Sequence, residues 1–172
     1  FSRSRKERVY VGYSPIVTVD AEKILADLPK AHVLHVVRNP WSAYADHKKR
    51  PVPLSLRTYM LGWTLCQHYA LIFKERFPER FHIARLEDVL HDPVSVLGGV
   101  CGKMGLNAAP SLKSPTWNRK KLKEVYPWGT IRKATVESNR AIGRELSPKE
   151  TADVRAFAQP YLTPLRYEDF PA

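Results

Sequence analysis

The chain has 172 residues, of which 44% are hydrophobic and 26% charged, the composition of one globular domain with its own core. Its formal net charge of +11 indicates anionic partners: a nucleotide cofactor, a polyanionic substrate, nucleic acid or a membrane surface. No apolar run approaches the roughly 20 residues that a membrane-spanning helix needs. The cysteines, Cys66 and Cys101, are too few for a disulfide scaffold and favour a reducing, cytoplasmic compartment. The opening Phe1-Ser2-Arg3 carries neither an initiating Met nor a signal core, so we expect a processed chain or part of a longer one.

The first part of the chain predicts a strand–helix–strand unit. Residues 9–13 are β-prone and predict a short strand, and the apolar spacing of residues 24–28 predicts a helix. The run from His32 to Val37 then predicts a buried strand. We expect His32 and His35 to be hydrogen-bonded within the sheet rather than catalytic.

The predicted strand ends in Arg38-Asn39-Pro40, and this junction is the most informative stretch of the sequence. Asn39 can cap a helix whose first turn accommodates Pro40. Free backbone N–H groups at such a helix start, beside the carboxyl end of a strand, can bind an anion. The guanidinium of Arg38 would stand at the mouth, where its fork matches two oxygens of a phosphate or sulfate.

The rest of the chain predicts helices around one more strand. In chain order these are a helix from Pro40 that ends before Pro51, a long amphipathic helix over 54–76, a strand over 81–86, a helix from Asp92 to about Met104, and a helix from Ser147 to about Ala158. Residues 110–146 lose this periodicity and predict a long loop or lid, and the tail from Pro160 is expected to be irregular. The order predicts a single α/β domain over 1–172, with a parallel sheet flanked by helices. Three strands are fewer than the mean of about five to six, which indicates that strands are missing at the N-terminus.

The order of these motifs resembles the sulfotransferases. The shared features are an apolar strand ending in Arg38-Asn39-Pro40, two helices, Arg85-Leu86-Glu87-Asp88-Val89-Leu90 followed by Asp92-Pro93, and a helix ending at Met104-Gly105-Leu106. The resemblance covers roughly residues 9–106 and implies a P-loop-like sulfotransferase fold. It also implies an enzyme that transfers a sulfuryl group from 3′-phosphoadenosine 5′-phosphosulfate (PAPS) to a hydroxyl or amine acceptor, and no metal is expected.

The resemblance further implies which residues hold the nucleotide. Arg38 would bind the 3′-phosphate. Asp46 stands where a serine usually shares this role, so Ser42, one turn earlier on the same helix face, is the predicted source of a hydroxyl. Leu86 replaces a tyrosine that usually reaches the nucleotide, and the following Glu87-Asp88 is expected to be structural.

A basic loop that contains glycine usually closes over the nucleotide in this family, and residues 126–133 are the candidate here. Gly129 permits close backbone approach, Arg132 and Lys133 supply charge, and Trp128 could stack on the base. An equally weighted alternative is a lid packed by its own aromatic side chains.

The Gly-, Ser- and Thr-rich loop that holds the 5′-phosphosulfate in this family is absent from the sequence. The chain is therefore expected to be the C-terminal part of a sulfotransferase, carrying the half that binds the 3′-phosphate. The catalytic base stays unassigned: His47 is a weak substitute, for which an exposed helix position is the favoured description.

Two alternative functions stay open. A non-catalytic member of the same fold would keep only an anion or nucleotide site, which the substitutions at Asp46 and Leu86 favour. A basic module would instead bind polyanions or nucleic acid through residues 3–8 and Arg119-Lys120-Lys121. Because no recognised nucleic-acid motif is present, nucleic acid is not the expected partner.

Overall fold

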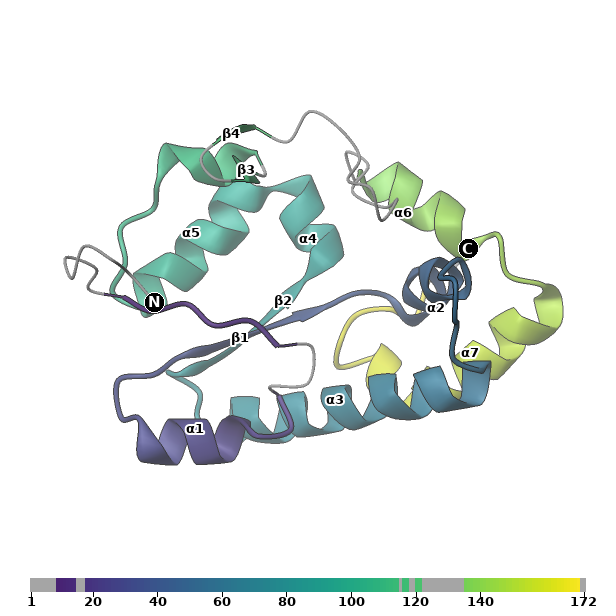
Figure 1. The fold of residues 1–172 in the computed structure, drawn as a ribbon, viewed down its shortest axis with the longest axis horizontal. Helices are drawn as coiled ribbons and strands as arrows, with labels where there is room; N and C mark the ends of the chain where they lie inside the picture. Colours follow the sequence, from purple (N-terminus) through teal and green to yellow (C-terminus); the bar gives the residue numbers. More distant parts are fainter. Residues whose placement is uncertain (1–8, 15–17, 115, 118–119, 122–134, 171–172) are drawn as a thin grey trace.

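A computed structural model describes residues 9–14, 18–114, 116–117, 120–121 and 135–170, and the statements below concern these residues. The elements, shown in Figure 1, are α1 (Ala21–Asp27), β1 (Val33–Val37), α2 (Pro40–Lys48), α3 (Leu56–Arg76), β2 (Phe81–Arg85), α4 (Leu86–His91), α5 (Pro93–Lys103), the 3-10 helix η1 (Pro110–Lys113), β3 (Thr116–Trp117), β4 (Lys120–Lys121), α6 (Val136–Gly143) and α7 (Pro148–Leu162).

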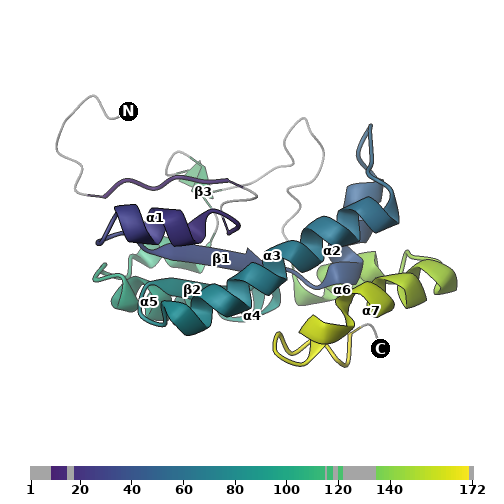
Figure 2. The ribbon, with the colours of Figure 1, turned by 90° about the horizontal axis from the view of Figure 1, so that it is seen from below.

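The centre of the fold is a parallel pair of strands. β1 pairs with β2 in a register that runs from Val33 opposite Phe81 to Val37 opposite Arg85. In Figure 1, α1 and α3 lie below the strands, and α4 and α5 lie above them. Figure 2 shows α1 on one side of the strands and α7, with the C-terminal segment, on the other. The predicted α/β class, with a parallel sheet flanked by helices, is confirmed.

Two clusters of buried apolar side chains hold these layers together, and α3 contributes to both. The larger cluster joins α2, α3, α7 and the C-terminal segment, and includes Trp41, Met60, Val154, Leu162, Tyr167 and Phe170. The smaller cluster joins α1, α3 and the strands, and consists of Ala21, Leu25, Val33, Ala70, Phe73 and Phe81. Burial of a large apolar side chain contributes about 1.5–3 kcal/mol to stability, so these clusters fix how α2 and α7 meet the sheet.

Helix starts follow the predicted capping chemistry. Asn39 Oδ1 accepts a hydrogen bond from the Ser42 backbone N–H at 2.8 Å, and Pro40 occupies the first turn of α2. Ser147 and Glu150 form a capping box at the start of α7. Within the described ranges, no helix is both long and apolar enough to cross a bilayer.

Three predictions about local structure are wrong. Residues 9–13 form no strand, and Tyr10 and Tyr13 are 87% and 92% exposed, because β-prone residues need a pairing partner to form a ladder. The predicted loop or lid over 110–146 contains helix α6, which packs on α2 and buries Asn139. Residues 160–170, expected to be irregular, are ordered: α7 continues to Leu162, and Leu165, Tyr167 and Phe170 enter the larger cluster.

Candidate functional site

Arg38 lies at the carboxyl end of β1, where the sequence places it, and two side chains of the protein hold its guanidinium. Its Nε donates to Asn139 Oδ1 at 2.6 Å, and its Nη1 forms an ion pair with Asp46. The Trp63 indole donates to the Arg38 carbonyl at 3.2 Å, which fixes the backbone at the strand end. The side chain of Arg38 is 23% exposed, so solvent still reaches it.

Asp46 and Ser42, the two residues predicted to lie beside the phosphate, differ in what they contact. The carboxylate of Asp46 meets Arg38 directly and is 29% exposed. Ser42 is fully buried, and its hydroxyl donates to the Asn139 carbonyl at 2.5 Å. A Cβ at Gly143 would lie only 3.0 Å from Ser42 Oγ, so α6 packs tightly against this part of α2. In this structure it is therefore Asp46, not Ser42, that meets the guanidinium, while Ser42 joins α2 to α6.

The carboxylate of Glu87 occupies the junction where β1 turns into α2. Its Oε1 accepts hydrogen bonds from the Asn39 backbone N–H at 3.1 Å, from Asn39 Nδ2 at 2.7 Å and from Asn139 Nδ2 at 2.7 Å. Its Oε2 accepts from the Tyr167 hydroxyl at 2.6 Å. Glu87 is thus an internal anion at the position where the sequence predicts an anion, and its expected structural role is confirmed.

Hydrogen bonding decides the charge state of this carboxylate. Burial opposes ionisation, but the hydrogen bonds from Tyr167 and Asn39 outweigh it and hold the pKa of Glu87 below its usual range. Burial, followed by the charge of Glu87, raises the pKa of Tyr167. The site at neutral pH therefore contains an ionised Glu87 and a neutral, hydrogen-donating Tyr167.

Asn139 is the site residue that the sequence does not reveal. It is 2% exposed, and its amide joins the Arg38 guanidinium to the Glu87 carboxylate. The signal that could have located its helix is weak, because Thr135 and Ser138 cap α6 reciprocally without the Glu or Gln that usually marks such a box.

His47 has a structural environment. It is 8% exposed, its Nε2 accepts the Leu54 backbone N–H at 2.8 Å, and its ring packs on Tyr59. Burial, helped by the charge of Arg50, lowers the pKa of His47 and keeps the imidazole neutral. The expected exposed helix position is wrong, because the chain after α2 folds back over this ring. A base needs a free lone pair, and Leu54 uses the one on Nε2.

His32 and His35 are hydrogen-bonded within the protein, as predicted, but the partners of His35 belong to α3 and to the turn before α1 rather than to the sheet. His35 lies between Thr18 Oγ1 and Gln67 Oε1, at 2.8 Å from each. His32 Nδ1 lies 3.1 Å from His82 Nε2 on the neighbouring strand. Neither His32 nor His35 meets Arg38 through these contacts, so they support the strands rather than the anion site.

The remaining predicted nucleotide contacts, Trp128, Gly129, Arg132 and Lys133, lie outside the described residues. Among the residues that are described, no group of three or more His, Cys, Asp or Glu side chains could hold a metal ion.

Comparisons with known proteins agree with the predicted family and with the observed fold. The profile of the family described as "Sulfotransferase family" matches residues 2–110, more than half of the chain. No curated protein matches the sequence. Among solved structures, a sulfotransferase domain from the curacin biosynthetic pathway is similar with a TM-score of 0.57 and 18% sequence identity. The similarity covers 88% of this chain and 59% of that domain, so this chain spans less than two thirds of it.

Proposed function

Because the chain belongs to the sulfotransferase family, we propose that it carries the 3′-phosphate-binding half of an enzyme that transfers a sulfuryl group from PAPS to a hydroxyl or amine acceptor. One observation carries this proposal: a solvent-accessible guanidinium, that of Arg38, fixed at the carboxyl end of a parallel strand. Ligands of open α/β sheets bind at this edge, and a guanidinium matches phosphate oxygens two at a time.

The buried network behind Arg38 supports the proposal because it keeps the guanidinium in place before a ligand arrives. Glu87 binds Asn39 and Asn139, and Asn139 in turn binds Arg38 Nε. Side chains that are held before binding lose little conformational freedom when the ligand arrives. Arg38 is therefore a positioning group for the nucleotide rather than a proton carrier.

Asp46 competes with the nucleotide phosphate for the Arg38 guanidinium. Its carboxylate neutralises Arg38 and would lie beside an incoming phosphate. Like charges at short range repel, so a phosphate must displace Asp46 from the guanidinium before it can bind Arg38.

PAPS would supply the sulfuryl group, which an acceptor oxygen or nitrogen takes in line at sulfur as the 3′,5′-bisphosphate leaves. Within this chain, Arg38 would hold the 3′-phosphate, and we propose that Gly129, Arg132, Lys133 and Trp128 close over the nucleotide. Holding the leaving nucleotide in line and balancing its charge lowers the barrier without proton transfer by these residues.

Titration with 3′-phosphoadenosine 5′-phosphate tests the proposal directly by calorimetry. We expect saturable binding that Arg38→Ala weakens at least tenfold, since it removes a charged hydrogen-bonding group worth about 1.5–3 kcal/mol. Arg76→Ala is the matched control, because Arg76 pairs with Glu22 away from the junction and its loss changes the net charge equally. Equal losses in both variants, or binding to any polyanion with a steep salt dependence, would instead support the basic module.

A non-catalytic nucleotide-binding member of the family is the second candidate. The ion pair between Arg38 and Asp46 favours it, because a neutralised guanidinium binds a phosphate less strongly. A transfer assay with radiolabelled sulfate donor separates the two candidates when it is run on the longest chain that contains this sequence. Nucleotide binding without transfer would support the second candidate, and transfer would exclude it.

A further inference from the structure

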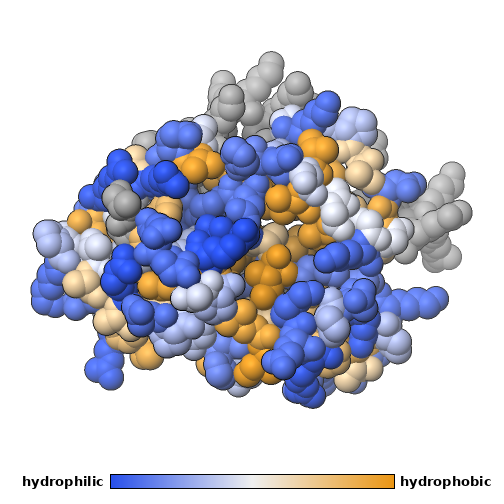
Figure 3. All heavy atoms as spheres, turned by 180° about the vertical axis from the view of Figure 1, so that it is seen from behind, coloured by the Kyte–Doolittle hydropathy of each residue, from blue (hydrophilic) through white to orange (hydrophobic). Residues whose placement is uncertain are grey.

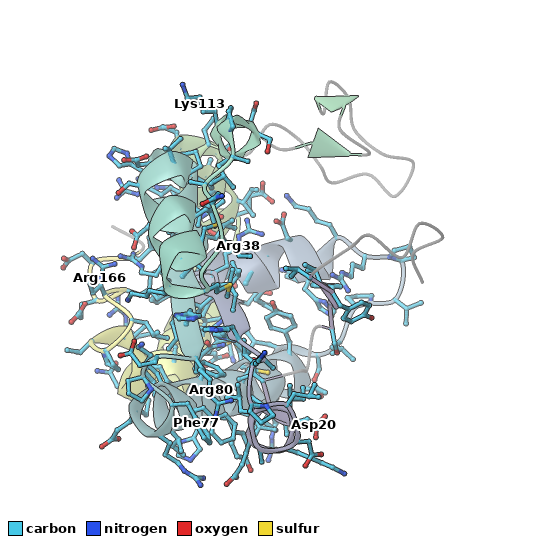
Figure 4. All side chains as sticks on the ribbon, turned by 90° about the vertical axis from the view of Figure 1, so that its left-hand side faces the viewer. Asp20, Arg38, Phe77, Arg80, Lys113 and Arg166 are labelled. Atoms are coloured by element: carbon cyan, nitrogen blue, oxygen red, sulfur yellow. The ribbon has the colours of Figure 1, made fainter. Side chains whose placement is uncertain are left out.

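One cavity of the described structure is lined neither by Arg38 nor by any other residue of the proposed nucleotide site. It has a volume of about 280 Å³ and is bounded by α3, β2, α4, α5 and residues 164–166. Its apolar wall includes Leu71, Ile83 and Val96. Figure 3 shows apolar side chains directly beside strongly hydrophilic ones on the face opposite that of Figure 1, and in Figure 4 Arg166 and Arg38 lie apart. The proposed nucleotide site does not use this cavity.

Cationic side chains outnumber the acidic ones around the cavity. Arg85, Arg166 and Lys74 line it together with one carboxylate, that of Asp88. Arg85 Nη1 lies 3.4 Å from Asp88 Oδ1, and Arg166 Nη2 lies 2.5 Å from Asp88 Oδ2, so both guanidinium groups share one carboxylate. This leaves an excess of positive charge beside an apolar wall.

Arg85 also contains a buried donor without a partner. Its guanidinium stacks 4.4 Å above the Tyr167 ring, and its Nε is buried and makes no hydrogen bond within the described part of the chain. Buried donors in folded proteins are nearly always satisfied, so an orphaned donor on a cavity-lining residue requires an explanation. A ligand acceptor atom would provide one only after the Arg85 side chain shifts toward the cavity, because solvent does not reach this nitrogen.

Arg166 adopts a backbone conformation that suits glycine better. Its φ is 55°, and the hydrogen bond from Tyr167 N to Leu162 O, 2.8 Å long, closes the end of α7 around it. Glycine usually occupies this left-handed position after a helix. The side chain of Arg166 is 69% exposed, and an ion pair at that exposure adds little stability. Stability of the helix end therefore does not explain an arginine here, whereas a binding role does.

We propose that this cavity binds a small amphiphilic anion, with one carboxylate or sulfate ester group on the cationic rim and a short apolar body against Leu71, Ile83 and Val96. The cationic rim favours a negatively charged group, and the apolar wall favours a hydrocarbon chain. A ligand with both parts should therefore bind more tightly than a ligand with only one of them. The volume lies just below the range of about 300–1,000 Å³ that is typical of small-molecule sites. The lining of the cavity and the proposed nucleotide site share no residue, and the two are joined through Tyr167, whose ring lies under Arg85 and whose hydroxyl binds Glu87.

Calorimetric titration with octyl sulfate, kept below its micelle-forming concentration, tests the ligand class. Inorganic sulfate and 1-octanol are the matched probes, since each contains half of the proposed ligand. We expect saturable binding of octyl sulfate, at least tenfold tighter than either matched probe. Comparable affinities for all three would overturn the proposal, as would the absence of saturation by octyl sulfate.

Variants of Arg166 test the site itself and keep folding separate from binding. Arg166→Gly relieves the left-handed backbone, so we expect the midpoint of thermal unfolding to rise by about 2–4 °C. The same variant should bind octyl sulfate at least tenfold more weakly. Arg166→Asn also tolerates the left-handed region and should show the same loss, whereas Arg76→Ala and Arg38→Ala should retain full affinity. Retained affinity in Arg166→Gly and Arg166→Asn would exclude a ligand role for Arg166 and leave the nucleotide proposal untouched.

Discussion

Asn139 on α6 accepts a hydrogen bond from Arg38, which lies 101 residues earlier at the end of β1. The same amide donates to Glu87 at the start of α4. One side chain therefore ties three segments that are distant in sequence into a single junction. The geometry of the predicted anion site depends on this amide as much as on the arginine.

Replacing Asn139 by alanine should destabilise the protein and weaken nucleotide binding together. The substitution leaves buried Glu87 with one donor fewer and frees the Arg38 guanidinium, and we expect a loss of about 2–3 kcal/mol in the free energy of unfolding. Urea denaturation measures the first effect and nucleotide titration the second. Asn107→Ala is the control, because Asn107 is exposed, and an equal effect of both variants would contradict the assigned role.

Replacing Asp46 by asparagine should tighten binding of 3′-phosphoadenosine 5′-phosphate by several-fold to about tenfold at neutral pH. The carboxylate that competes with the phosphate for Arg38 is removed, at a loss of less than about 1 kcal/mol for a partly exposed ion pair. Glu145→Gln is the matched control, since it removes a charge that pairs with Lys49 instead. Weaker binding by the Asp46 variant would show that Asp46 orients Arg38 rather than blocking it.

Stability should fall in acid partly through Glu87. Its pKa in the folded protein is below the unfolded value of about 4.3, so its contribution is fully present above that pH and is lost as pH falls through the folded pKa. Glu87→Gln should therefore be less stable than the unmodified protein at pH 7, and the difference should shrink below about pH 4. Denaturant midpoints measured between pH 7 and pH 3 test this, and a pH-independent difference would contradict it.

His47 should contribute to the pH dependence of stability in a higher pH range than Glu87. Because burial lowers its pKa, its stabilising effect is complete above the unfolded value of about 6.5 and declines as pH falls below it, when protonation removes the acceptor used by Leu54. Between pH 7.5 and 5, we expect His47→Gln to lose less stability than the unmodified protein, as measured by denaturant midpoints. His68→Gln, at an exposed position of α3, should follow the unmodified protein.

The sequence predicts well those features of the structure that depend on residues close to one another in the chain. The Asn39 cap, Pro40 in the first turn of α2 and the Ser147 capping box depend on neighbouring residues, and all are confirmed, as is the resemblance to sulfotransferases. The contact of Glu87 with Asn39 is different, because these residues are 48 positions apart and meet only when the ends of β1 and β2 lie side by side.

Periodicity and composition also mislead where tertiary contacts decide the outcome. Helix α6 lies in a region where the sequence shows no apolar periodicity. Its buried residues are Asn139, which is polar, and Gly143, which has no side chain, so neither contributes to an apolar pattern. His47 is buried because residues after α2 cover it, which the helix pattern alone does not show. Whether Trp128, Gly129, Arg132 and Lys133 contact the nucleotide stays a prediction.

The distance in sequence between Arg38 and Tyr167 has a consequence for biosynthesis. The Tyr167 hydroxyl binds Glu87 beside the Arg38 junction, and Phe170 packs on Trp41 of α2. The ribosome makes Arg38 well before these aromatic residues. The Arg38 junction can therefore form in full only after Tyr167 has left the ribosome, so a nascent chain that stops short of Tyr167 should be unable to hold Glu87 in place.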